Sequence, residues 1–170
     1  MKTLVMIGGA MGVGKSTVAE RLLNRLERSV WLDGDWCWMQ GNHWQFDEEC
    51  RDMAMDNIVH VLNGFLKNSH FDTVIFSWVL HLPEIHRQIL DALRENEFRL
   101  VNVSLVCDEA TLAQRIHRRA LDTGLPEEAE RAQMARALER MRHYEALDTI
   151  HVDVSGRDPG QVCEAVLALL

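Results

Sequence analysis

One stretch near the start decides the fold of this chain: Gly9-Ala10-Met11-Gly12-Val13-Gly14-Lys15-Ser16-Thr17. It fits the phosphate-binding pattern G-x-x-x-x-G-K-S/T at every fixed position. An apolar run at residues 4–7 precedes it and predicts a buried strand, while residues 16–26 have the apolar spacing of a helix. Glycines let a backbone bend around an anion, and a helix start favours negative charge. We therefore predict a phosphate-binding loop between a strand and a helix.

The side chains of this loop match what a nucleotide phosphate requires. Lys15 can reach the β- and γ-phosphates, and the Ser16 hydroxyl can ligate Mg²⁺. We expect the whole stretch from Gly9 to Thr17 to bind the nucleotide, with Lys15 also catalytic and Ser16 a magnesium ligand. The alternative is a plain glycine-rich turn, which this strand and helix context disfavours.

The length, the net charge and the cysteine positions limit which class of protein this can be. The 170 residues suit a single domain over 1–170. A net charge of −8 argues against a nucleic-acid partner, and no apolar run is long enough to span a membrane. The cysteines form no C-x-x-C pair and no signal peptide is seen, so we expect a cytoplasmic protein with reduced thiols. We expect a monomer or a homodimer.

Strands alternate with helices along the chain. Strand-like apolar runs occupy residues 3–7, 29–32, 73–78, 99–106 and 149–154, with helical patterns between them and after the last. This alternation predicts an α/β, three-layer fold, in which a five-stranded parallel sheet has helices on both faces. We expect the strand at 29–32 to lie next to the first strand. Ligands of such sheets bind at the carboxyl ends of the strands.

Two carboxylates, Asp33 and Asp35, follow the second strand. Residues two apart on an extended segment point the same way, so these two carboxylates are expected to lie together. Mg²⁺ or the proton of a substrate hydroxyl would relieve their repulsion. The alternative is an Asp-Gly-Asp turn without a function.

The stretch Leu32-Asp33-Gly34-Asp35 resembles the L-D-G-D stretch of gluconate and adenylylsulfate kinases, and its acidic pair resembles that of shikimate kinases. The resemblance is to P-loop small-molecule kinases and implies that ATP is the nucleotide. It implies that Asp35 binds the acceptor hydroxyl and acts as general base. Asp33 would contribute to the acceptor site and to the water shell of Mg²⁺. The third strand lacks a terminal acid, and its Ser77 could be an indirect partner of Mg²⁺.

Two arginines, Arg115 and Arg119, lie four residues apart after the fourth strand, which gives them one helix face. The same resemblance places a helical lid here, at about 115–135, and implies that both arginines are catalytic and that Arg115 also contacts the nucleotide. Arg118 could replace Arg119, and a solvated basic face is the alternative. By the same resemblance the loop containing Arg157 lines the adenine site.

An aromatic group departs from the gluconate and shikimate kinases, whose pockets use basic residues. It consists of Trp36, Trp38, Trp44, Phe46 and Trp78. An acceptor with a flat or apolar part would suit stacking on such rings, so we expect Trp36 and Trp78 to bind it. The alternative is that the rings pack in the core. His43 and His81 could reach the same pocket, but a lone histidine is more often structural.

Together these features predict an ATP- and Mg²⁺-dependent kinase of the EC 2.7 class. It would transfer the γ-phosphoryl group to a small-molecule acceptor such as a nucleoside, a nucleotide, or an aromatic-bearing metabolite or antibiotic. The alternative function is a non-catalytic or regulatory P-loop protein that binds a nucleotide. A GTPase switch is disfavoured, because no guanine-reading N-K-x-D motif is present in a suitable place.

Overall fold

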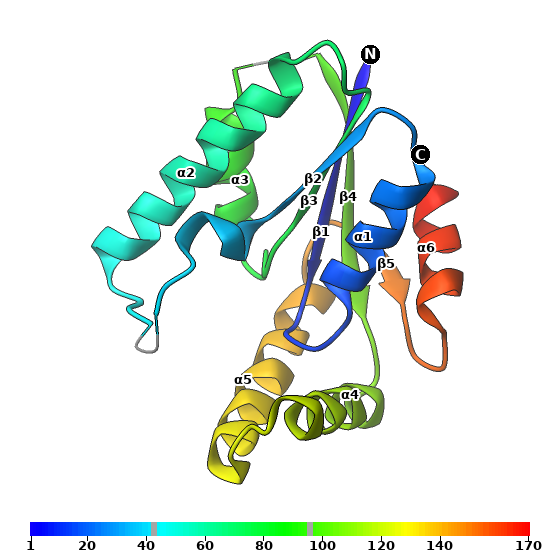
Figure 1. Ribbon diagram of the computed structural model, residues 1–170. Helices are drawn as coiled ribbons and strands as arrows, with labels where there is room; N and C mark the ends of the chain where they lie inside the picture. The colour runs from blue at the N-terminus through cyan, green and yellow to red at the C-terminus, as the bar shows by residue number, and fades with distance from the viewer. Residues whose placement is uncertain (42–43, 95–96) are drawn as a thin grey trace.

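Five parallel strands form one sheet, in the order β2-β3-β1-β4-β5 (Figure 1). The computed structural model describes residues 1–41, 44–94 and 97–170. The strands are β1 Lys2–Gly9, β2 Ser29–Asp33, β3 Thr73–Ser77, β4 Phe98–Val106 and β5 Ile150–Asp153. The predicted five-stranded parallel sheet is therefore confirmed.

The prediction that the strand at 29–32 lies next to the first strand is wrong. β3 lies between β1 and β2, since Val74 pairs with Leu4 on one side and with Val30 on the other. The burial of the two strands explains this order. β3 is fully buried from Val74 onward, as suits a strand with neighbours on both sides, whereas β2 at the sheet edge is only partly buried over its first three residues.

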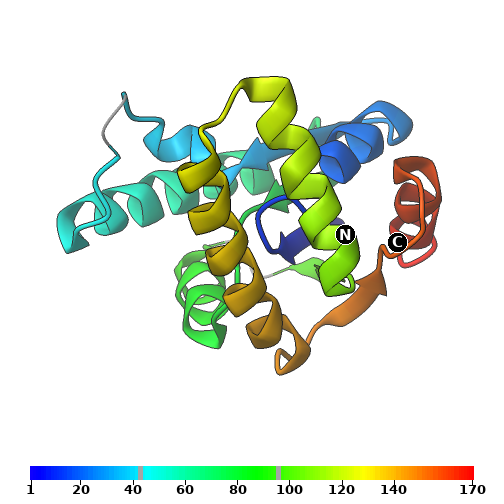
Figure 2. The ribbon, with the colours of Figure 1, turned by 90° about the horizontal axis from the view of Figure 1, so that it is seen from below.

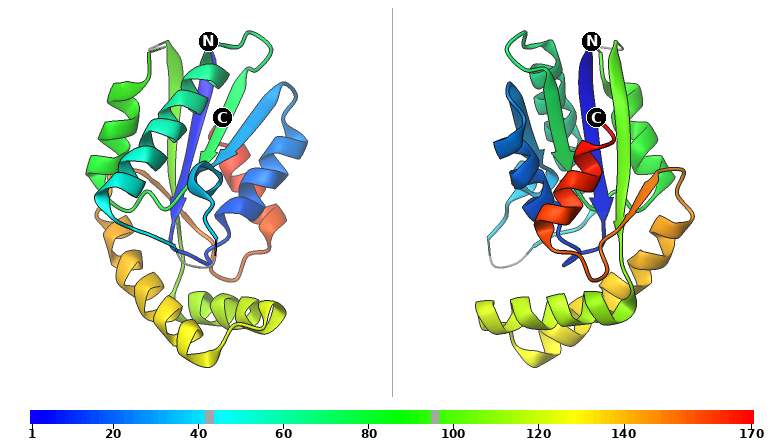
Figure 3. Two further views of the ribbon diagram at one scale, coloured as in Figure 1. Left: turned by 60° about the vertical axis from the view of Figure 1, so that its left-hand side comes forward. Right: turned by 90° about the vertical axis from the view of Figure 1, so that its right-hand side faces the viewer.

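Helices cover both faces of the sheet (Figures 1 and 3). They are α1 Lys15–Arg25, α2 Glu48–Lys67, α3 Pro83–Ala92, α4 Glu109–Thr123, α5 Glu127–Glu145 and α6 Pro159–Leu167. Alternate residues of β1 serve the two resulting cores. Val5 and Ile7 pack with α1 and α6, and Leu4 and Met6 pack with α2 and α3. None of the helices described over 1–41, 44–94 and 97–170 is long and apolar enough to cross a membrane.

The helix starts follow predicted signals. Pro83 lies in the first turn of α3, where a missing backbone N–H costs nothing. Asp108 caps α4 by accepting a hydrogen bond of 2.6 Å from the backbone N–H of Thr111. After β2 the chain forms a short 3₁₀ helix, η1, at Gly34–Trp38. This agrees with the loop or short helix expected for the aromatic stretch, whose residues 42–43, including His43, lie outside the described residues.

α4 and α5 lie across the carboxyl end of β1, in the part of the chain where a helical lid is predicted (Figure 2). Gly124, in the left-handed region at φ 65°, ends α4 and lets the chain reverse. The start of α4 is fixed to the phosphate-binding loop, because Leu112 and Ile116 are buried in the core that contains Val13. The later half of α5 is anchored in the same core by Met141 and Tyr144.

Candidate nucleotide and acceptor site

The loop from Gly9 to Lys15 needs its glycines for two separate reasons. Gly9 has φ 152°, and a Cβ there would lie 2.7 Å from Val13 Cγ1. Gly14 has φ 109° and precedes the first residue of α1. A Cβ on Gly12 would lie 2.8 Å from Ile116 Cγ1, so this glycine admits the lid helix. The loop is thus shaped both by its own turn and by its contact with α4.

Lys15 lies inside the curve of this loop. Its Nζ donates hydrogen bonds of 2.9 Å to the carbonyl of Gly9 and 3.1 Å to that of Ala10. Burial lowers the pKa of Lys15 to about 8, although the nearby carboxylates Asp35 and Asp33 act in the opposite direction. The ammonium is therefore held close to both acids at the start of α1.

Asp33 joins β2, β3 and the phosphate-binding loop. Its Oδ2 accepts hydrogen bonds from the Ser16 hydroxyl at 2.9 Å and from the Ser77 hydroxyl at 3.2 Å. The side chain is only 8% exposed. A hydroxyl and a carboxylate at this separation are the oxygen donors that Mg²⁺ prefers beside nucleotide phosphates. No group of three or more His, Cys, Asp or Glu side chains suited to a metal occurs within the described ranges.

Asp35 is placed by a turn rather than by an extended segment, so that part of the expectation is wrong. The chain enters η1 at Gly34, and the N–H of Asp35 donates to Asp33 Oδ1 at 3.1 Å. Trp78 Nε1 donates to Asp35 Oδ1 at 3.1 Å. A Cβ on Gly34 would lie 2.4 Å from Trp78 Cγ, so the glycine provides the space for this ring. The two acids nevertheless lie together at one edge of the sheet.

Arg115 is bound to backbone carbonyls. Its Nη1 donates to the carbonyl of Val13 at 2.6 Å, and its Nη2 donates to those of Val154 at 3.3 Å and Arg157 at 3.4 Å. It therefore ties the phosphate-binding loop to the turn that follows β5. Arg157 contributes its carbonyl, while the residue itself is exposed.

A cavity of about 310 Å³ opens between this loop and that turn. Gly12 and Thr17 line it on one side, Val154 and Pro159 on the other, and Arg115 and Arg118 reach it from α4. Of the candidate arginines, Arg118 rather than Arg119 thus lines this cavity.

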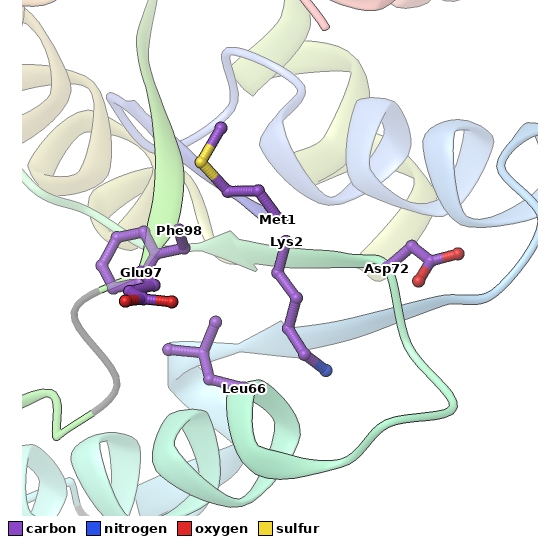
Figure 4. Close-up of a pocket in the computed structure, with 6 residues that line it drawn as sticks. All are labelled: Met1, Lys2, Leu66, Asp72, Glu97 and Phe98. Atoms are coloured by element: carbon purple, nitrogen blue, oxygen red, sulfur yellow. The ribbon is translucent and has the colours of Figure 1, made fainter.

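A second cavity, of about 220 Å³, lies at the opposite, amino-terminal end of the sheet, where β1 and β4 begin (Figure 4). Its charged lining residues are Lys2, Asp72 and Glu97. The Lys2 ammonium is already bound to the carbonyls of Asn68 and Phe71. None of the predicted site residues lines this cavity.

Arg119, on α4, and Arg140, on α5, lie near enough to Lys15 to affect it electrostatically. Their positive charges add to the lowering of its pKa, after the larger effect of burial. Neither guanidinium has an acidic partner within the described part of the chain. Sequence reasoning missed Arg140, because α5 is rich in charge and has the composition of a solvated helix. The one signal in the sequence was that Arg140 precedes an apolar residue, Met141, which is buried in the structure.

His81 lies near Arg140. Burial lowers the pKa of His81 to about 4, and the charges of Arg140 and His143 act in the same direction. Its Nδ1 is buried and has no hydrogen-bond partner in the described ranges. The imidazole is therefore neutral near pH 7.

The aromatic residues form two groups. Trp36 is 52% exposed and packs on Trp31, with ring centroids 4.7 Å apart. Trp38 lies edge-on to Trp44, Phe46 and Trp78, at centroid distances of 5.6, 5.6 and 6.3 Å. Trp78 is only 9% exposed. The core-packing alternative thus describes Trp78, whereas Trp36, the residue after Asp35, is half-exposed.

Comparisons with known proteins agree with this geometry. The family model described as "AAA domain" matches residues 5–149. No curated protein sequence matches the chain. A solved tunicamycin resistance protein of Deinococcus radiodurans is similar with a TM-score of 0.73 at 19% identity, covering 99% of this chain and 95% of that one.

Two further solved structures are similar. A gluconokinase from Sinorhizobium meliloti 1021 has a TM-score of 0.70 at 20% identity, covering 98% of this chain and 90% of that one. A shikimate kinase from Acinetobacter baumannii, in complex with shikimate, has a TM-score of 0.62 at 20% identity, covering 99% and 92%. At sequence identities this low, the structural similarity shows a shared fold alone. Because the family match spans residues 5–149 of 170, the chain belongs to the AAA domain family, and its fold is that of P-loop small-molecule kinases.

Proposed function

We propose that this protein is an ATP- and Mg²⁺-dependent phosphotransferase that moves the γ-phosphoryl group to a hydroxyl of a small-molecule acceptor. One observation carries the proposal. The Ser16 hydroxyl of the phosphate-binding loop lies 2.9 Å from Asp33 Oδ2, and the exposed Asp35 follows two positions later in the chain. A pure nucleotide-binding loop has no need of the second carboxylate, whereas a transfer reaction needs a group that positions the acceptor.

The donor half uses the loop and the lid. The backbone N–H groups from Gly9 to Thr17 and the Lys15 ammonium would hold the phosphates of ATP. When bound, Mg²⁺ would neutralise charge on the β- and γ-phosphates, with Ser16 as a ligand and Asp33 holding its water shell. Arg119 and Arg140 would stabilise charge on the group in transfer.

Arg115 would act on the same half by fixing the loop. The cavity beside Arg115, Arg118 and the turn at Arg157 would take the adenine.

The acceptor half would be formed by Asp35 and the rings near it. Asp35 would orient the acceptor hydroxyl and take its proton. The half-exposed ring of Trp36 supports an acceptor with a flat part, such as a nucleoside, a nucleotide, or an aromatic-bearing metabolite or antibiotic. The similar structure from Deinococcus radiodurans is that of a tunicamycin resistance protein, which supports including antibiotics among the compounds tested.

The test is acceptor-dependent formation of ADP. Purified protein with Mg²⁺ and ATP is screened against nucleosides, nucleotides, sugar acids and hydroxyl-bearing antibiotics. With an active acceptor, Asp35→Asn should lower turnover at least about 100-fold, the usual contribution of a general base, while the affinity for ATP stays within about threefold. Asp52→Asn, at an exposed position of α2, is the matched control and should keep wild-type turnover.

Two results would count against this assignment. ATP binding without any acceptor-dependent turnover would favour a non-catalytic nucleotide-binding protein. Loss of ATP binding in Asp35→Asn would move Asp35 from the acceptor to the metal.

A further inference from the structure

We propose that Trp31 and Trp78 are positioning residues, each of which orients one carboxylate of the acidic pair through its indole N–H. The inference rests on the proposed function for its kinetic consequence, but the bonds themselves can be tested without any turnover. Trp78 acts directly on Asp35, and Trp31 acts on Asp33 through the hydroxyl of Ser77.

The Trp78 contact fixes one oxygen of Asp35. Trp78 Nε1 lies 3.1 Å from Asp35 Oδ1. The ring is only 9% exposed and packs on the backbone of Gly34, so it has little freedom to turn. Among the described residues no hydrogen bond reaches Asp35 Oδ2. Oδ2 is therefore the oxygen that faces a hydroxyl of the acceptor.

The Trp31 contact fixes Asp33 through a relay. Trp31 Nε1 donates to Ser77 Oγ at 3.0 Å, and Ser77 Oγ donates to Asp33 Oδ2 at 3.2 Å. An indole N–H can only donate, so the single hydrogen of the Ser77 hydroxyl must point to Asp33. Ser77 is 0% exposed, so no water competes for that bond. The relay favours Asp33 as an acceptor, the form in which a carboxylate holds a hydrated cation.

Both contacts come from strands other than the one that carries the phosphate-binding loop. Trp31 lies on β2, and Trp78 directly follows β3. These contacts hold the two acids in addition to the bond from Ser16 of the loop to Asp33. This also assigns Trp78 a role other than stacking on the acceptor, for which its ring is too buried.

Nuclear magnetic resonance of the indole N–H groups tests the bonds directly. The chain has five tryptophans, and Trp31→Phe and Trp78→Phe identify their two signals. Asp35→Asn should shift the Trp78 signal and leave that of Trp31 in place. Ser77→Ala should shift the Trp31 signal and leave that of Trp78. If Asp35→Asn leaves the Trp78 signal unmoved, or Ser77→Ala leaves that of Trp31 unmoved, the proposal fails for that residue.

Kinetics and binding test the consequence. With wild-type circular dichroism as the folding criterion, Trp78→Phe should lower kcat about 10- to 100-fold, as for loss of a hydrogen bond to a charged group, with nucleotide affinity unchanged. Trp31→Phe should raise the Mg²⁺ concentration needed for half-maximal nucleotide binding about tenfold.

A raised acceptor KM at unchanged kcat in Trp78→Phe would assign the ring to acceptor binding and overturn the proposal for Trp78. An unchanged Mg²⁺ requirement in Trp31→Phe would overturn it for Trp31. If wild-type protein shows no turnover at all, the proposed function fails. The resonance shifts and the Mg²⁺ requirement then decide the positioning roles alone.

Discussion

At the scale of single residues, Lys15 shows how burial changes the pKa of a residue in the site. Burial lowers its pKa to about 8 from an ordinary value of 10.5. A lysine that binds its proton less tightly in the folded state destabilises the fold while both states are protonated. This cost is present in full below pH 8 and is relieved as the pH rises from about 8 toward 10.5.

A pH series with Lys15→Met tests this cost. Between pH 7 and pH 9.5, without nucleotide, the free energy of unfolding of the wild type should rise relative to the variant by about 1–2 kcal/mol. Denaturant titrations at the two pH values measure the difference, and the comparison cancels other titrating groups. If the difference in the free energy of unfolding between wild type and variant stays flat or falls as the pH rises, the charge of Lys15 does not destabilise the free protein.

The place of Lys15 and Ser16 in a loop between a strand and a helix could be predicted from the sequence, because the spacing of the motif defines it. The contact of Trp78 with Asp35 could not, because the two residues are 43 positions apart and meet only through sheet pairing. Arg140 could not be predicted for a related reason. It is one of many charged residues on α5, and only the folded structure brings its charge near Lys15.

At the scale of elements, the turn from β2 into η1 depends on Gly34. Gly34→Ala would put a Cβ 2.4 Å from Trp78 Cγ and should displace that ring, and with it Asp35. We expect a loss of about 1–3 kcal/mol in the free energy of unfolding, together with lower turnover. Gly64→Ala, in α2 with nothing within 4 Å of the new Cβ, is the control. It should be more stable by about 0.5–1 kcal/mol. Equal stability of the two variants would contradict this role of Gly34.

The phosphate-binding loop depends in a similar way on Arg115, in the middle of α4. Arg115→Ala removes hydrogen bonds to Val13, Val154 and Arg157, so the phosphate-binding loop loses its tie to the turn after β5. We expect nucleotide affinity to fall about tenfold, measured by calorimetry. The exposed Arg136 of α5, as Arg136→Ala, should leave affinity unchanged. Wild-type affinity in Arg115→Ala would show that the loop holds its shape alone.

Element types followed from periodicity, and most predicted boundaries lie within one or two residues of those observed. The order of strands did not follow, because periodicity says nothing about which strands pair. The burial of β3 from Val74 to Ser77, seen only in the structure, agrees with its place inside the sheet.

At the scale of the whole molecule, nucleotide and metal should stabilise the fold together. At an ATP concentration of about 100 times Kd, binding contributes about 2.7 kcal/mol, which raises Tm by about 5–10 °C for a chain of this size. Chelation of Mg²⁺ should remove most of this shift, because under the proposed function Ser16 and Asp33 would act on the phosphates only through the metal. Thermal unfolding with and without chelator measures the effect. An undiminished shift after chelation would remove Mg²⁺ from the proposal.

The order of strands places the phosphate-binding loop and the acidic pair on two different strands. The central strand β1 leads into the phosphate-binding loop, while Asp33 ends the edge strand β2 and Asp35 follows it, with β3 between the two strands. An edge strand can change its outer residues at little cost to the core. If the residues near Asp35 bind the acceptor as proposed, exchanging the exposed residues that follow Asp35 should change the acceptor while ATP remains the phosphoryl donor. Such a division would suit the scaffold to diversification.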